Sequence, residues 1–443
     1  MINHRTASRR RRSQFIAGIA IVSLVAAACG GDEADDATAT TAAQVTATTA
    51  AEDTATTAAQ VTATTAAQDT ATTTAATDAA PAPSGDMPTE IGEGEGELNI
   101  IAWAGYVEDG STDPAVDWVT GFEEETGCEV NVQLGNSSDD MVQLMQSGEY
   151  DGVSASGDAT LRLIAGGEAS PVNVDLIPNY VDVYEDLKLQ NHNSVDGVPY
   201  GVPHGRGANL LVYNTDLYET APDSWAEMFE PSTAAPGAVS VYDSPIYIAD
   251  AALYLMSTQP DLGITNPYAL DQTQFDAAIE LLNAQKDLVG QYWALYTDQQ
   301  AALEGGTALV GTTWQVIVNL ATGNGATIDA VKPVEGATGW SDTWMISSQA
   351  AHPNCMYMWM DHIISPEANA GVAEWFGEAP SNELSCDLTA DPEHCTTFHA
   401  GDTAYWEDVW YWTTPEETCL DDRTDVKCVP YTEWVNAWNT LRS

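Results

Sequence analysis

The sequence predicts an α/β protein with two lobes, preceded by an export signal and a long tether. From residue 97 onward, short apolar runs alternate with segments of helical spacing. This alternation is typical of parallel strands with helices on both faces of the sheet. Residues 97–443 are also too many for one simple core, so two lobes are expected.

The charge of the chain is strongly negative. It has 13 Lys and Arg against 66 Asp and Glu, a formal net charge of −53 at pH 7. Binding to nucleic acid needs a basic face, and an anionic membrane repels acidic protein, so neither partner is expected. An acidic surface suits solubility in salt or the attraction of cations, and the composition leaves both open.

The N-terminus has the features of an export signal. Arg9–Arg12 form a positive cluster, and Phe15–Val25 is an apolar run too short to span a bilayer comfortably. The small residues before Cys29 resemble the lipobox of bacterial lipoproteins. We therefore predict that residues 1–28 are a lipoprotein signal peptide and that Cys29 carries lipid. The alternative is ordinary cleavage after Ala28 with an incidental cysteine.

Residues 29–96 are expected to be a disordered tether. Octads such as Ala39–Thr46 (ATTAAQVT) and Ala47–Thr54 (ATTAAEDT) offer only small side chains, which cannot offset the entropy of ordering. Proline and alternating Gly-Glu residues follow, as in flexible linkers. The tether would hold the folded module away from the membrane, on the extracellular face of the cytoplasmic membrane.

The first elements of the module follow from apolar spacing and capping residues. Strands are expected at Leu98–Trp103, Cys128–Leu134 and Tyr150–Ser154, and helices from Asp113–Pro114, after Ser137–Ser138–Asp139 and at Asp158–Ile164.

The later elements follow the same patterns. Further strands are expected at Asn209–Tyr213, Thr307–Gly311 and Thr343–Ile346. Further helices are expected at Ile246–Met256, Gln274–Gln285, Gln299–Leu303, from Trp314, and at Met356–Ile364, Pro366–Phe376 and Tyr431–Leu441.

Besides Cys29, the chain has an even number of cysteines, which in an exported domain suggests disulfides. Cys386/Cys395 and Cys419/Cys428 have the same short spacing and are easy local pairs, which leaves Cys128 with Cys355. A competing scheme joins Cys355 to Cys386. Zinc is the other use of cysteine, but no Cys-x-x-Cys or His-x₃-His spacing occurs, so no metal is expected.

Catalytic motifs are absent from the sequence. It has no Gly-x-Ser-x-Gly, no His-Glu-x-x-His and no phosphate-binding loop. Gly152–Gly157 has the small neighbours of a nucleophile turn but misses the spacing. We therefore expect no enzyme activity and no cofactor.

Several short patterns occur in order along the module. They are Ile100–Tyr106 (IIAWAGY), Phe122–Gly127 (FEEETG), Tyr150–Val153 (YDGV), Val202–Pro203 with Gly207–Asn209, Ser224–Pro231 (SWAEMFEP) and the block from Ile328 to Asp342. Together they resemble the extracellular solute-binding receptors of ABC importers, specifically the spermidine/putrescine-binding group. The resemblance implies a type II periplasmic-binding-protein-like fold, with the ligand in a cleft between the lobes.

We expect the lobes to be discontinuous in sequence. Lobe 1 would comprise residues 97–206 plus 341–390, and lobe 2 residues 207–340 plus 391–443. The crossings would then lie near Arg206 and Trp340.

The resemblance also implies a set of ligand-binding residues. An extended diamine needs apolar walls and π faces, for which the matching positions supply Trp103, Tyr106, Trp314 and Trp340. Asp342 is the expected ammonium partner, and Ser154 and Ser156 lie on the loop after the third strand. The ordinary alternatives are core tryptophans and a solvated Asp342; for Asp158, a helix N-cap is the favoured interpretation.

Two positions depart from the polyamine-binding pattern. Ser244 and Tyr247 stand where the group has a carboxylate pair, with Asp243 nearby. Arg206 stands at the lobe crossing, where it would either clamp a carboxylate or bind an acid elsewhere in the protein. A mono-amine or an amino acid-like solute therefore remains open.

The resulting hypothesis is a monomeric, lipid-anchored receptor that binds a small, cationic, polyamine-like solute and delivers it to an ABC permease. The alternative is a secreted enzyme or a sugar-binding protein on a related two-lobe scaffold, since aromatic walls with an aspartate also suit sugars.

Overall fold

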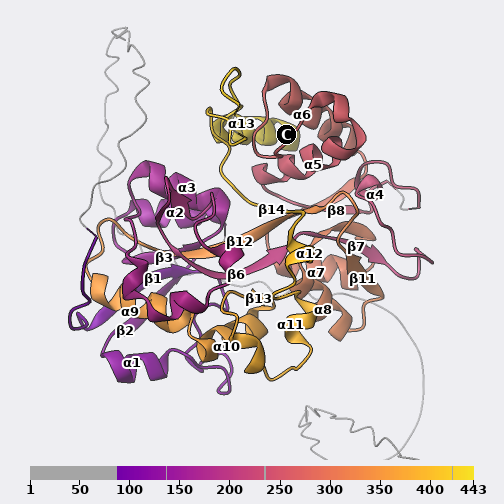
Figure 1. Cartoon of the computed structure of the whole chain (residues 1–443). Helices are drawn as coiled ribbons and strands as arrows, with labels where there is room; N and C mark the ends of the chain where they lie inside the picture. The colour runs from indigo at the N-terminus through magenta and orange to yellow at the C-terminus, as the bar shows by residue number, and fades with distance from the viewer. Residues whose placement is uncertain (1–86, 136, 234–235, 422) are drawn as a thin grey trace, which may run out of the picture. The chain divides into compact units, whose positions relative to one another are not determined.

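Two large β-sheets with helices on their faces form most of the folded part of the chain (Figure 1). A separate two-stranded sheet pairs β4 Ser194–Val195 with β5 Val198–Pro199. A computed structural model describes residues 87–443 except 136, 234–235 and 422. The predicted signal peptide, Cys29 and the octads lie outside the described residues.

The first sheet combines strands from distant parts of the sequence. Its order is β13-β6-β12-β3-β1-β2, with β14 paired to β12. β1 is parallel to β2 and β3, whereas β12 is antiparallel to β3 and β6. The strands are β1 Glu97–Ala102, β2 Glu129–Leu134, β3 Gly152–Ala155, β6 Val202–Ala208, β12 Ala337–Ile346, β13 Ala379–Pro380 and β14 Val409–Tyr411.

The second sheet has the order β11-β7-β10-β8-β9. The chain reaches it through Asn209, between β6 and β7, and returns after β11, so each lobe has its own sheet. The expected two-lobe α/β architecture is confirmed, while the residue limits of the lobes remain a prediction. The strands are β7 Leu210–Asn214, β8 Val239–Tyr242, β9 Val289–Trp293, β10 Val310–Thr313 and β11 Ile328–Val331.

Helices cover both faces of each sheet (Figure 1). α2 and α3 pack on one face of the first sheet, and α1 and α9 pack on the other. In the second sheet α5, α6 and α13 share one core, and α8 lies in another. The helices are α1 Thr120–Thr126, α2 Ser138–Gln146, α3 Gly157–Gly166, α4 Ala226–Phe229, α5 Ile248–Thr258, α6 Gln272–Gln285, α7 Tyr296–Glu304, α8 Gln315–Gly323, α9 Pro353–Ile363, α10 Pro366–Phe376, α11 His394–Thr397, α12 Thr403–Trp406 and α13 Tyr431–Arg442.

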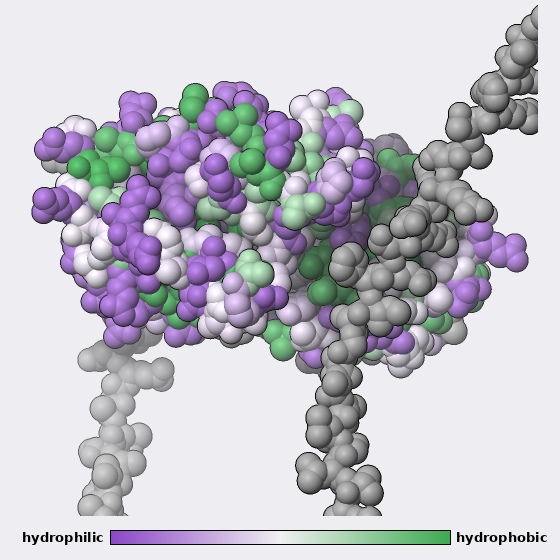
Figure 2. Space-filling model, turned by 90° about the horizontal axis from the view of Figure 1, so that it is seen from below, coloured by the Kyte–Doolittle hydropathy of each residue, from purple (hydrophilic) through white to green (hydrophobic). Residues whose placement is uncertain are grey.

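Strand periodicity explains the two faces of the first sheet. In β1, Leu98 and Ile100 face the core that contains Trp359 of α9, whereas Ile101 faces Met141 of α2. Side chains of a strand alternate between faces, so an apolar run of this length requires cover on both sides. On the side seen from below, hydrophilic residues cover most of the surface and hydrophobic residues form separate patches (Figure 2).

The prediction that the first helix begins at Asp113–Pro114 is wrong, because the helix begins later in the chain. Asp113 instead closes a turn, because its carbonyl oxygen accepts the Val116 N–H at 2.8 Å. The helix begins at Thr120, where the Asp117 carboxylate accepts the backbone N–H of Thr120 at 2.9 Å. An acid at a helix start satisfies N–H groups that have no partner within the helix.

Part of the predicted tether is attached to the module. Asn173 donates to the Pro88 carbonyl at 2.8 Å, and Gly92 N–H donates to Asn354 at 2.7 Å. The Glu95 carboxylate accepts the Cys355 N–H at 2.9 Å. These bonds fix residues 88–95 near the start of α9, so the segment free to act as a tether ends before them.

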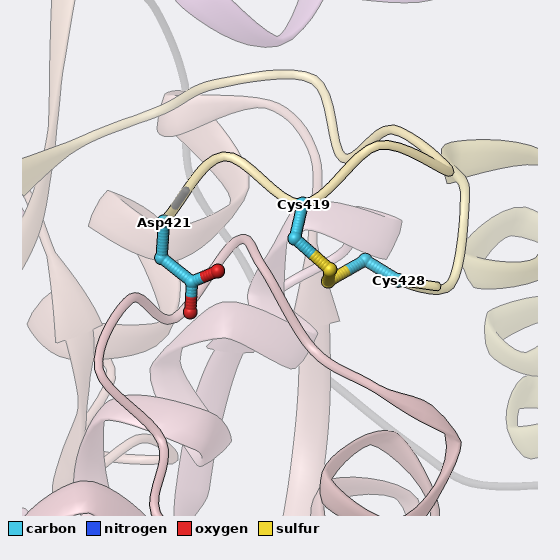
Figure 3. Close-up of side chains that lie close together, drawn as sticks. All are labelled: Cys419, Asp421 and Cys428. Carbon is cyan, nitrogen blue, oxygen red and sulfur yellow. A yellow bond between two sulfur atoms is a disulfide. The ribbon is translucent and has the colours of Figure 1, made fainter. Parts of the chain in front are cut away.

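The structure contains the disulfides Cys128–Cys355, Cys386–Cys395 and Cys419–Cys428, which is the first of the two pairing schemes. Figure 3 shows Asp421 close to the Cys419–Cys428 pair, a grouping of the kind that can hold a metal ion. Both sulfurs are consumed by the disulfide, however, and thiolates are the form that binds metal.

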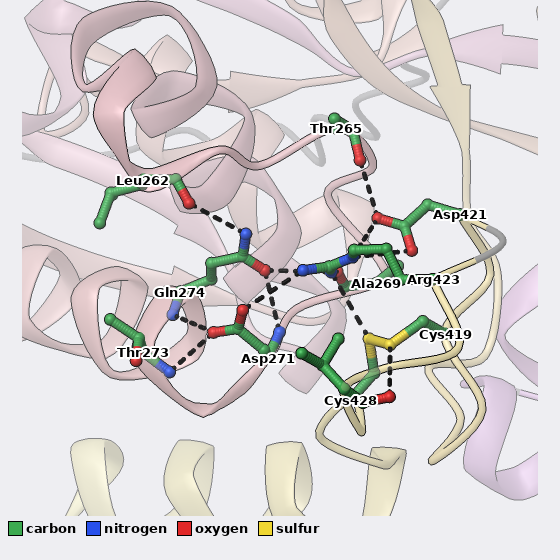
Figure 4. Close-up of polar contacts among 11 residues, drawn as sticks. Leu262, Thr265, Ala269, Asp271, Thr273, Gln274, Cys419, Asp421, Arg423 and Cys428 are labelled. Carbon is green, nitrogen blue, oxygen red and sulfur yellow. Dashed lines mark hydrogen bonds and ion pairs between the residues drawn. A yellow bond between two sulfur atoms is a disulfide. The ribbon is translucent and has the colours of Figure 1, made fainter.

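An arginine occupies the space beside this disulfide (Figure 4). Arg423 Nε donates to the Asp421 carboxylate at 2.8 Å, and its Nη2 donates to the Ala269 carbonyl at 2.6 Å. Its Nη1 reaches Asp271, the N-cap of α6, at 3.3 Å. The carboxylate of Asp421 is therefore already paired, and the C-terminal loop is fastened to the second lobe.

Candidate functional site

A cluster of buried polar groups lies where strands of the first sheet end. Tyr106 follows β1, Ser156 follows β3, and Asp342 lies within β12. Open α/β sheets place ligands beside the carboxyl ends of their parallel strands. The fold thus brings together three of the expected residues, which are far apart in the sequence.

Asp342 accepts hydrogen bonds from two other side chains of this cluster. Tyr106 donates its hydroxyl proton to Asp342 Oδ2 at 2.7 Å, and the Ser156 hydroxyl donates to Oδ1. The side chain is only 3% exposed, and burial raises the pKa of Asp342 to about 6. Desolvation disfavours the charged form, and the two hydrogen bonds only partly oppose this effect.

A second buried acid, Glu378, lies beside Asp342 and was not expected from the sequence. It is fully buried, and its Oε2 lies 3.3 Å from the Tyr106 hydroxyl. Burial and then the charge of Asp342 raise the pKa of Glu378 well above its usual value. The Tyr106 hydroxyl therefore lies within hydrogen-bond distance of both acids.

His204 does not neutralise these acids. Its Nδ1 accepts a hydrogen bond from Trp344 Nε1 at 3.0 Å, so the proton of the neutral ring is on Nε2. That nitrogen lies 3.4 Å from Glu378 Oε1. Burial lowers the pKa of His204 to about 3, and the ring therefore stays neutral at physiological pH.

The cluster therefore lacks a positive charge. Among the described residues, no Lys or Arg forms an ion pair with Asp342 or Glu378. Buried carboxylates without a cationic partner are costly unless a ligand supplies the charge.

Aromatic rings form a continuous wall beside the acids. Phe376 contacts Tyr106 at 4.5 Å between ring centroids and Trp340 at 5.9 Å, and Trp340 lies 6.5 Å from Trp314. Gly207 allows this arrangement, because a Cβ at that position would lie 2.4 Å from the Trp340 ring. Such faces suit methylene chains and cations.

Arg206 is tied to an acid of the first lobe. Its Nη1 donates to Asp186 at 2.7 Å and to the Tyr411 hydroxyl at 3.1 Å, and its guanidinium lies 4.4 Å from the Trp406 ring. Its Nε and Nη2 have no hydrogen-bond partner among the described residues. Of the two roles considered for Arg206, pairing with an acid is the one seen in the structure.

The remaining expected residues lie apart from this hydrogen-bonded cluster. Trp103 Nε1 and Ser154 Oγ are buried and have no hydrogen-bond partner among the described residues. Ser244 caps a short 3₁₀ turn, and Tyr247 lies 3.4 Å from Gln285 Oε1 through its hydroxyl. Their roles in ligand binding remain predictions.

Two nearby acids have structural partners. Asp243 forms an ion pair with Arg442 at 3.0 Å. The N-cap interpretation of Asp158 is wrong, because Ser156 holds the N-cap position of α3. The Asp158 carboxylate is buried and accepts from Ser138 at 2.9 Å instead.

Comparisons with a family model and with known proteins point to the same family. Residues 117–395 match the family described as bacterial extracellular solute-binding protein. A spermidine/putrescine-binding periplasmic protein of Haemophilus influenzae is 23% identical over 320 residues, which cover 70% of this chain and 83% of that protein. A putrescine/agmatine-binding protein of Pseudomonas aeruginosa is 25% identical over 286 residues, which cover 60% of this chain and 75% of that protein.

A solved structure shows the same fold. The spermidine/putrescine ABC transporter substrate-binding protein of Streptococcus pneumoniae superposes with a TM-score of 0.61 at 16% identity, covering 78% of this chain and 99% of that one.

Because the family match spans more than half of the chain, the protein belongs to the bacterial extracellular solute-binding proteins. The expected fold class is confirmed, and so is the expectation of a binding protein rather than an enzyme. Within the described residues, no helix has the length and apolar character needed to cross a membrane.

Proposed function

We propose that this protein binds a small, amine-bearing, polyamine-like solute between its lobes and delivers it to an ABC permease. The observation that carries the proposal is the buried pair Asp342 and Glu378, which has no cationic partner among the described residues. An ammonium group supplies the missing charge and can donate hydrogen bonds to both carboxylates.

The aromatic wall supports the same class of ligand. Phe376, Trp340 and Trp314 form a series of ring contacts that begins at Tyr106, and aromatic faces suit both the methylenes and the charged ends of an amine. The names of the two relatives, spermidine/putrescine-binding and putrescine/agmatine-binding, point to the same chemistry. Closure of the two lobes around the solute would exclude water from the site.

A thermal-shift screen tests the proposal. Polyamines, mono-amines, amino acids and sugars are each added to the purified protein at the same concentration. A ligand that binds only the folded state raises the melting temperature by mass action. We expect amines to raise it and sugars to leave it unchanged. A rise with sugars alone would overturn the proposal.

The affinity for an amine is expected to depend on pH. Protons compete with the ammonium group for Asp342, whose pKa in the free protein is about 6 because of burial. The affinity should therefore be constant at high pH and fall as the pH drops through about 6, by up to about tenfold per pH unit for one proton. His204 stays neutral in this range and does not oppose the effect.

Titration calorimetry at pH 8, 7 and 5 measures this dependence, with circular dichroism as a control for folding. Equal affinities at all three values would argue against Asp342 as the ammonium partner.

We further propose that the receptor is held to the extracellular face of the cytoplasmic membrane by lipid on Cys29. The motif around Cys29 and the following low-complexity segment support this anchor. Cys29→Ser should leave the precursor unprocessed or release the protein to the medium. Cell fractionation and mass determination follow both forms. A processed Cys29→Ser protein that stays on the membrane would refute the anchor.

A further inference from the structure

A cavity of about 20 Å³ lies where the chain passes from the first sheet to the second. Arg206 and Gly207 of β6 line it from the first sheet, and Leu210 of β7 lines it from the second. The segment that carries α11 and α12 completes the lining, and these helices lie close to α8 in Figure 1. A space of this size holds one small ion or one water molecule and excludes an organic solute.

Arg206 brings an incompletely paired positive charge to this cavity. The residue is 1% exposed, and its Nη1 donates to Asp186 and to the Tyr411 hydroxyl. Its Nε and Nη2, by contrast, have no hydrogen-bond partner among the described residues. Nε carries one proton and Nη2 carries two, so more than half of the five N–H groups of the guanidinium are unpaired. Buried donors without a partner are costly, which indicates that an acceptor binds here.

Trp406 fixes the guanidinium beside the cavity. Its ring centroid lies 4.4 Å from the guanidinium carbon, and its Nε1 donates to the His399 carbonyl at 2.8 Å. Trp406 and His399 both line the cavity as well. One edge of the guanidinium is therefore paired and one face is stacked, while the edge formed by Nε and Nη2 is left for a ligand. This edge is the fork with which arginine binds anions.

The N-terminus of α8 meets the same cavity. Trp314 is the N-cap of this helix and Gln315 is its first residue, and both line the cavity. Within the part of the chain that the structure describes, no side chain caps this helix end. The first N–H groups of a helix have no partner within the helix and carry partial positive charge, so they attract anions.

No carboxylate lines the cavity within the described residues, although the chain has 66 Asp and Glu. Asp186 pairs with Arg206, but its side chain is 38% exposed, so solvent weakens its compensation of the buried charge. Trp340 adds a buried Nε1 donor without a partner in the described part of the chain. An anion can accept from several donors at once, whereas a water molecule has two protons that need acceptors of their own.

We propose that this cavity binds one chloride ion, held by Arg206 Nε and Nη2 and by the N-terminus of α8. Sulfate, phosphate and carboxylic acids are too large for the space. The site goes beyond the proposed function, because it is specific for an anion and neither Asp342 nor Glu378 lines it. The ion contacts segments of both sheets, so it stabilises the folded protein at the point where the chain passes between them.

Thermal unfolding in sodium gluconate that is replaced stepwise by sodium chloride tests the proposal. The ionic strength is kept at about 0.3 M, so that the screening of surface charges stays constant. Gluconate is too large for the cavity, whereas bound chloride stabilises the folded state by mass action. We expect the melting temperature to rise by about 1–4 °C and the rise to saturate with chloride concentration. A melting temperature that does not change, or that changes linearly without saturation, would overturn the site.

Two matched variants assign the effect to Arg206. Arg206→Lys keeps the positive charge and can still pair with Asp186, but it lacks the fork. It should lose the saturable rise. Arg162→Lys changes another arginine that pairs with an aspartate, Asp139, and should keep the rise. The same saturable rise in Arg206→Lys as in the parent would overturn the role of Arg206.

Diffraction from crystals of the parent protein grown in bromide locates the ion directly and does not depend on any variant. Bromide replaces chloride and gives an anomalous signal near its absorption edge. We expect one anomalous peak in the cavity, next to Arg206 Nε and Nη2. Electron density for a water molecule only, without an anomalous peak, would overturn the proposal even if Arg206→Lys does not fold. Neither measurement involves an amine, so both outcomes leave the proposed function untouched.

Discussion

Asp342→Ala is expected to weaken the binding of a cationic solute by about 2–5 kcal/mol, the loss typical of truncating a buried charge pair. The mutation removes the acceptor of the Tyr106 and Ser156 hydroxyls and leaves the ammonium group without its main partner. Trp340→Ala should cost less, about 1–2 kcal/mol, because it removes a π face and packing but no charge.

Titration calorimetry of the variants with an amine identified by screening measures these losses. Asp287→Ala, at an exposed position of the second lobe, is the control for removal of one negative charge. If the solute instead carries a carboxylate, Arg206→Ala should be the more damaging change, because the free Nε and Nη2 atoms are suited to bind it. Parent-like affinity of Asp342→Ala would contradict the assignment of Asp342.

Removal of the Cys128–Cys355 disulfide is expected to lower the free energy of unfolding by about 5 kcal/mol, against about 3 kcal/mol for Cys419–Cys428. The sequence separations are 227 and 9 residues, and a longer closed loop restricts the unfolded chain more. Both pairs are buried, so the difference reflects mainly the loop length.

Urea unfolding of the two double Cys→Ala variants, compared with the parent, measures the difference. The variant that lacks the Cys128–Cys355 disulfide should unfold at a lower urea concentration than the variant that lacks Cys419–Cys428. Equal midpoints would show that loop closure does not control the stability of this fold.

Elements with a clear apolar pattern were predictable from the sequence. β1 is an apolar run and lies one residue from its expected limits, and α13 carries Trp434 and Trp438 one turn apart on its buried face. Local chemistry also identified the start of α2, where Ser137 caps the helix through the Asp140 N–H. In these segments the local pattern and the tertiary environment favour the same structure.

Elements stabilised mainly by their neighbours were not predictable. β6 (VPHGRGA) has no alternating pattern, because His204 and Arg206 are buried by partners from distant segments. β9 and β14 were missed as well, since their pairing with β8 and β12 depends on the assembled sheets. Strand propensity depends strongly on such context.

In the candidate site, too, some residues were predictable from the sequence and others were not. Tyr106, Ser156 and Asp342 were expected from the resemblance, and the fold brings them into hydrogen-bond contact. Glu378 has no distinctive sequence context and joins them only because β13 pairs with β6 beside His204.

The central claim is that the protein is a receptor for a small amine, and calorimetric titration of the purified protein with 1,4-diaminobutane at pH 8 tests it most directly. We expect saturable binding with one diamine per chain, and competition by longer polyamines. The absence of binding by any amine in the same buffer, together with saturable binding of a sugar, would contradict the claim.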